Sequence, residues 1–148
     1  LFLLSLAGLA LTVYGVIIPT EIRDYFGDKE MNIETMTVRL GLVKASLLSM
    51  VLLLLGAVLI GTAFLLTLAF GKYPWLSVLL LVIPVAVSFV LGKFRRIHAL
   101  SKELGRSNTQ DSISEEMVSF SADNPRWIMV MTQTYSVLSI ILLVSKIL

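Results

Sequence analysis

Four long stretches of this sequence carry no formal charge, and they limit the fold more than any other feature. They are Leu1–Thr20, Ala45–Gly71, Tyr73–Gly92 and Trp127–Ser145. Each has at least 19 residues, and roughly 20 apolar residues are enough for a helix to cross the hydrocarbon core of a bilayer. Charged residues make up 15% of the chain, against about 25% in soluble domains. The sequence therefore predicts an all-α, polytopic transmembrane bundle with four helices here.

These stretches and their flanks give the predicted boundaries. Helices are expected at about residues 1–24, 43–71, 74–94 and 126–147, with polar cytosolic loops at 25–42 and 95–125. Gly56 and Gly61 thin one side of the second helix, which predicts close packing against a neighbour. The whole chain, 1–148, is assigned to a single domain. It is expected to be the C-terminal part of a longer protein.

The predicted loop at 95–125 also contains helical periodicity. Four apolar residues recur there at helical spacing, namely Phe94, Ile97, Leu100 and Leu104. Basic residues lie opposite them, which predicts a helix that leaves the membrane and lies on its surface. Ser112 and Glu115 form a capping box, which predicts that a further short helix begins there.

The distribution of charge predicts the orientation. Ten of the twelve Lys and Arg residues lie in or beside the two predicted loops that share a side, and so do all ten Asp and Glu residues. The opposite side has only Lys72 and Lys146. The positive-inside rule therefore predicts a multi-pass cell membrane protein whose charged side faces the cytoplasm. The net charge of +2 follows from this topology and does not indicate nucleic-acid binding.

Two absences narrow the chemistry. The chain has no cysteine, which excludes disulfides, thiolate metal ligands and a cysteine nucleophile. Its one histidine, His98, excludes a site with several histidine ligands within this chain. We expect His98 to lie at the membrane interface rather than to bind a metal.

An acidic stretch follows the first apolar segment. Glu21, Asp24 and Asp28 are spaced by three and four residues, which places their carboxylates on one face of a helix. Carboxylates that share a face repel one another unless a cation lies among them. Oxygen ligands alone favour a hard ion such as Mg²⁺. The spacing is equally compatible with a solvated acidic helix end whose charge is balanced by Arg23 and Lys29.

This stretch and the segment after it resemble a known family. Asp24-x-x-x-Asp28-Lys29, followed by Thr35-Met36-Thr37-Val38-Arg39-Leu40-Gly41, is similar to the second aspartate-rich motif of the UbiA superfamily of intramembrane prenyltransferases. The close match covers about Glu21 to Leu42. The resemblance implies a fold of nine helices, of which this chain would supply helices six to nine. It also implies two aspartate-rich motifs that face each other across a central cavity.

The resemblance further implies a function and roles for named residues. The activity would be Mg²⁺-dependent transfer of an isoprenyl group from a prenyl diphosphate donor to an aromatic or other hydrophobic acceptor, within membrane lipid. Asp24 and Asp28 would be the catalytic metal ligands, and Glu21 a further ligand or a support for one. Diphosphate contacts would come from Lys29, Arg39 and Arg23. Because the first motif is expected in the N-terminal half of the same protein, this chain alone is expected to be inactive.

Two other functions use similar features. An ion-coupled transporter could use Glu21, Asp24 and Asp28, because acids in membrane helices are usually functional. A CDP-alcohol phosphotransferase-like enzyme also has paired aspartates on a membrane helix. The upstream Asp-Gly-x-x-Ala-Arg segment that such an enzyme requires is absent from this sequence.

Overall fold

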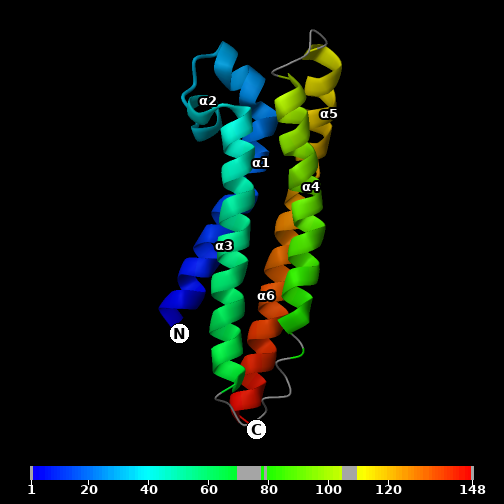
Figure 1. The fold of residues 1–148 in the computed structure, drawn as a ribbon. Coiled ribbons are helices and arrows are strands. Elements are labelled where there is room, and N and C mark those ends of the chain that lie inside the picture. The colour runs from blue at the N-terminus through cyan, green and yellow to red at the C-terminus, as the bar shows by residue number, and fades with distance from the viewer. Residues whose placement is uncertain (1, 70–77, 79, 105–109, 148) are drawn as a thin grey trace.

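The computed structural model describes residues 2–69, 78, 80–104 and 110–147. Within these residues the chain is helical and has no strand, which confirms the all-α prediction. The helices are α1 (Phe2–Glu30), α2 (Met36–Leu40), α3 (Leu42–Ala69), α4 (Val82–Leu104), α5 (Gln110–Ala122) and α6 (Asn124–Ile147). They form an elongated bundle in which α1 lies along α3, and α4 lies beside α6 (Figure 1). The short helices α2 and α5 lie at one end.

Two of the described helices are long and apolar enough to cross a membrane. These are Leu3–Glu30, with a mean hydropathy of 1.9, and Leu42–Ala69, with 2.6. Large apolar side chains such as Leu47, Leu55 and Val58 are exposed along the second of them, as expected where lipid replaces water. The predicted span at 74–94 lies partly outside the described residues.

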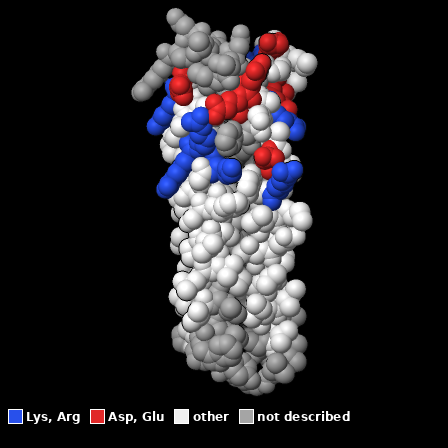
Figure 2. Space-filling view, turned by 90° about the vertical axis from the view of Figure 1, so that its right-hand side faces the viewer, with Lys and Arg blue, Asp and Glu red and all other residues white. Residues whose placement is uncertain are grey.

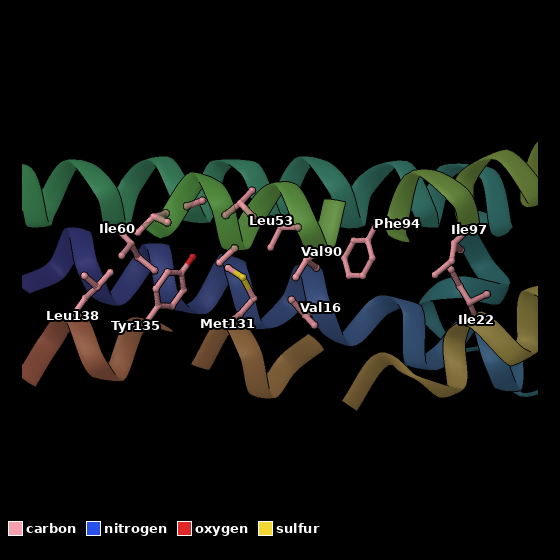
Figure 3. Close-up of a cluster of buried hydrophobic side chains, with 14 of the residues drawn as sticks. Val16, Ile22, Leu53, Ile60, Val90, Phe94, Ile97, Met131, Tyr135 and Leu138 are labelled. Carbon is pink, nitrogen blue, oxygen red and sulfur yellow. The ribbon is translucent and has the colours of Figure 1, made fainter. Parts of the chain in front are cut away.

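A continuous apolar core runs along the bundle (Figure 3). Every long helix contributes buried side chains to it, among them Val16 and Ile22 from α1, Leu53 and Ile60 from α3, Val90, Phe94 and Ile97 from α4, and Met131 and Leu138 from α6. Because these helices are apolar on most sides, van der Waals packing, rather than a separation of polar from apolar faces, determines which residues form the core.

Glycines set the distance between α1 and α3. A Cβ atom added to Gly56 would lie 2.7 Å from the carbonyl oxygen of Gly8, and one added to Gly15 would lie 2.8 Å from the amide nitrogen of Leu53. The two backbones are therefore too close for any side chain at these positions. The prediction of close packing is confirmed at Gly56. It is wrong at Gly61, where the nearest described atom to an added Cβ would be 4.0 Å away.

The first predicted loop, 25–42, is wrong over most of its length. Helix α1 does not end near residue 24 but continues to Glu30, and α2 occupies five residues of the remainder. The helix continues because Tyr25 and Phe26 pack against the core one turn beyond the buried Ile22. A polar sequence thus stays helical because one face of it is still buried.

The second predicted polar segment, 95–125, contains both of the helices that its periodicity and its capping box predicted. Helix α4 continues to Leu104, and α5 follows from Gln110, two residues before the predicted capping box. The apolar stripe predicted from Phe94 onward is present, but it does not lie on the membrane surface. Phe94, Ile97 and Leu100 are buried in the core, because α3 and α5 pack against α4.

Candidate functional site

Charged side chains gather at the end of the bundle where α2 and α5 lie. On the face shown in Figure 2, the described Lys, Arg, Asp and Glu residues are confined to this end, and the remaining described surface is uncharged. Helix α1 carries the acidic stretch into this region without a break. Glu21, Asp24 and Asp28 therefore lie about one turn apart on one helix, as the spacing predicted.

Glu21 is committed to a structural contact. Its Oε2 atom accepts a hydrogen bond from the Thr37 hydroxyl at 2.9 Å and one from the Thr37 backbone amide at 3.3 Å. Thr37 is fully buried and is the second residue of α2, so its amide has no acceptor within that helix. The carboxylate therefore fixes the start of α2 to the side of α1. Sequence reasoning placed Glu21 among the metal-binding residues and missed this contact.

Asp24 pairs with its neighbour. The Arg23 guanidinium donates to both carboxylate oxygens of Asp24, from Nε at 3.0 Å and from Nη2 at 3.2 Å. About half of each side chain remains exposed. Exposed ion pairs contribute about 0–1 kcal/mol, so a divalent cation or an anionic ligand could replace either partner at little cost. Both residues remain accessible for the roles predicted for them.

Asp28 and Lys29 close the C-terminal turn of α1. Asp28 is half-buried, and its backbone carbonyl accepts from the amide of Ile33 at 2.8 Å. Lys29 is exposed, and its Nζ lies 5.9 Å from the centroid of the Tyr25 ring. That contact leaves the three N–H groups of the ammonium available to a ligand.

The Arg39 side chain forms an ion pair with Glu34. Its Nη2 and Nε donate to Oε2 of Glu34, at 2.6 and 3.2 Å, and both side chains are about 70% exposed. Both residues belong to the segment around α2, whose N-cap is Thr35. Arg39 is therefore paired within its own segment in this arrangement, and the exposed pair can exchange partners at little cost.

A cavity of about 500 Å³ lies between the end of α1, the junction of α2 with α3, and the end of α4. The residues that line it are Tyr25, Phe26, Lys29, Leu40, Gly41, Leu42, Val43, Lys44, Ser101 and Leu104. Lys29 is the one predicted site residue among them. The sequence also places Lys44 within reach of the acidic helix end, as a basic side chain suited to a diphosphate, and the structure brings it to the same cavity as Lys29.

The described carboxylates supply only some of the ligands that a magnesium ion needs. Among the residues that the structure describes, no three His, Cys, Asp or Glu side chains are grouped so as to hold a metal. Asp24 and Asp28 can offer two carboxylates from one helix face. Mg²⁺ usually takes one or two protein carboxylates and completes its shell with water and substrate phosphates, so this pair fits half of a site.

Comparison of the chain with family models, with curated proteins and with solved structures finds no match. The resemblance to the UbiA superfamily therefore depends on the residues between Glu21 and Leu42 alone.

Proposed function

We propose that the charged end of this bundle is one half of a magnesium-dependent prenyltransferase site. The observation that carries the proposal is the position of Asp24 and Asp28. They lie one turn apart on α1, where an apolar helix reaches the charged end and Lys29 borders a cavity. A prenyl diphosphate has the matching form, an anionic head on an apolar chain.

The residues of this chain would divide the work as follows. Asp24 and Asp28 would hold Mg²⁺, which neutralises the negative charge that develops on the leaving diphosphate. Lys29 would donate hydrogen bonds to diphosphate oxygens, and Arg23 would do so after releasing Asp24 to the metal. Glu21 would keep α2 against α1 and so hold Arg39 near the site. The apolar helix ends would exclude water, which protects an allylic cation from hydrolysis.

The proposal includes a multi-pass membrane protein with this site on the cytoplasmic side. Grouping of the described charges at one end supports it (Figure 2), as does the excess of Lys and Arg in the segments at this end. The chain lacks cysteine, so a single cysteine introduced at position 29 gives a clean test. It should react with an impermeant thiol reagent only after the cells are opened, and labelling of intact cells would contradict the orientation.

The decisive experiment removes the two carboxylate charges in the full protein. Asp24→Asn and Asp28→Asn should each lower the release of diphosphate from an allylic prenyl diphosphate on the order of 100-fold, because Asn keeps the size but loses the charge that holds Mg²⁺. The matched control is Asp123→Asn, an exposed aspartate at the same end that pairs with Arg126 at 3.4 Å. It should leave turnover nearly unchanged.

Stability must be followed alongside activity. Asp24 is about half exposed and Asp28 is half-buried, so melting temperatures should change little. If both Asn variants retain near wild-type turnover, the carboxylates do not hold a catalytic metal. A solvated acidic helix end would then be the better interpretation.

A further inference from the structure

The cavity at the charged end is a feature separate from the acidic face of α1. Tyr25 and Lys29, one turn apart, border it, whereas Asp24 and Asp28 do not. On a helix, each aspartate is offset by about 100° from the cavity residue that follows it. The cavity therefore lies around the side of α1 from the carboxylates.

The charge of this cavity is one-sided. Lys29 from α1 and Lys44 from α3 both line it, and none of the described lining residues is acidic. Both lysines are exposed. Two ammonium groups that share a cavity repel each other, and an anion between them removes that repulsion.

Three residues that line the cavity also have backbone amides without a helical acceptor. Helix α3 begins at Leu42, and its first helical hydrogen bond runs from the amide of Ala45 to the carbonyl of Gly41 at 3.0 Å. The amides of Leu42, Val43 and Lys44 precede that bond and have no acceptor within the helix. All three residues line the cavity. Gly41, with φ of 75°, allows the chain to turn from α2 into α3 at this point.

The remaining wall is apolar and aromatic. It includes Phe26, Leu40, Val43 and Leu104, with Tyr25 beside Lys29. A volume of about 500 Å³ falls within the range of roughly 300–1,000 Å³ that is usual for small-molecule sites. The cavity thus combines two cations, free amides and apolar surface.

We propose that this cavity binds a phosphate group without a metal ion, between Lys29, Lys44 and the first amides of α3. A helix of 28 residues adds the positive end of its dipole to the two ammonium groups. Phosphate oxygens accept hydrogen bonds from both kinds of donor. The proposal shares Lys29 with the proposed prenyltransferase site, but it does not depend on prenyl transfer, because it uses neither Asp24 nor Asp28 and needs no metal ion.

The test measures phosphate binding in the absence of divalent cations. The full protein, purified in a neutral detergent with a chelator, is titrated with inorganic diphosphate in a calorimeter. We expect binding that weakens roughly tenfold in Lys44→Gln and in Lys29→Gln, as loss of a charged hydrogen bond implies. Lys44→Arg should retain most of the affinity because it keeps the charge. The matched control is Lys93→Gln, because Lys93 lies at the same end but over the Trp127 ring.

A second arm identifies the source of the phosphate. The same variants are placed in phosphatidylcholine vesicles with and without phosphatidic acid, and bound lipid is counted by native mass spectrometry. Retention of phosphatidic acid that Lys44→Gln abolishes would identify a lipid headgroup, and diphosphate binding alone would identify a soluble ligand. Either result supports the site. It is overturned if the wild type binds neither, or if Lys44→Gln and Lys93→Gln behave alike.

Discussion

Helix α1 has two regions that are built in opposite ways. Its first half is fixed against α3 by backbone contact, because Gly8 and Gly15 leave no room for side chains and the Ser49 hydroxyl donates to the Gly15 carbonyl. Its last turns carry charges that are exposed and paired locally, as Arg23 is with Asp24. In the first region, close backbone contact fixes the position of α1 against α3. In the second region, the exposed charged side chains can exchange ion-pair partners.

The difference separates stability from function. Contacts between packed backbones are lost entirely when a methyl group is inserted, since interiors have few voids to absorb it. Exposed ion pairs contribute about 0–1 kcal/mol, so losing one changes stability little but can remove a ligand. We therefore expect substitutions in the first region to change melting temperature, and those at the charged end to change binding and turnover.

The largest effect on stability should come from Gly56→Ala. The new Cβ atom would overlap the Thr12 hydroxyl and lie 2.7 Å from the Gly8 carbonyl oxygen, so α1 and α3 must separate. We expect a loss of about 2–3 kcal/mol, typical of overpacking. Thermal unfolding in detergent measures it.

Gly61→Ala is the matched control for that prediction. The same change is made on the same helix, but the added methyl group would meet Ile83 only at an ordinary van der Waals distance of 4.0 Å. Alanine is favoured over glycine in a helix by about 1 kcal/mol, so this variant should be no less stable than the wild type. Equal destabilisation of both variants would mean that the glycine contact does not hold α1 to α3.

A smaller effect is expected where the two regions meet. Glu21→Gln keeps an acceptor for Thr37 but makes the hydrogen bonds neutral, which should cost about 1 kcal/mol. Amide exchange at residues 36–40 should accelerate as α2 loosens from α1. Turnover should fall less than in Asp24→Asn, because Glu21 supports the site through α2.

The control for Glu21 is Glu34→Gln, which removes the same charge from an exposed pair with Arg39. It should leave amide exchange in α2 nearly unchanged. If Glu21→Gln also leaves it unchanged, the carboxylate is not what holds α2, and its contact with Thr37 is incidental.

Local pattern predicted much of this architecture. The spacing of Glu21, Asp24 and Asp28 correctly predicted that the three residues lie on one helix, because that prediction depends only on the helical period. The stripe that begins at Phe94 was also correct as a stripe. Its surroundings were not, because period identifies which residues share a face and not what covers that face.

The rest depends on contacts between distant parts of the sequence. Glu21 and Thr37 are 16 positions apart in the sequence. Lys29 and Lys44, which share the cavity, are fifteen positions apart. The sequence suggests that both lysines lie near the acidic helix end, but nothing in its composition encodes the hydrogen bond between Glu21 and Thr37. The site therefore could be predicted as a motif on one helix, but not as a cavity formed by three.

The smallest expected effect concerns His98, which joins α4 to the start of α3. Its Nδ1 lies 2.9 Å from the Ser46 hydroxyl oxygen, which lies 3.1 Å from the Val43 carbonyl oxygen. Partial burial, followed by the positive charge of Lys102, lowers the pKa of His98 below its usual value. The folded state therefore resists protonation more than the unfolded state does. Stability should be full above the unfolded pKa of about 6.5 and should fall as pH drops through that value, levelling off below the folded pKa. Melting curves of the wild type and of His98→Asn, which keeps a hydrogen-bonding group near Nδ1, should diverge in that window. No other histidine is present in the chain, so parallel curves would show that burial of His98 does not couple this junction to pH.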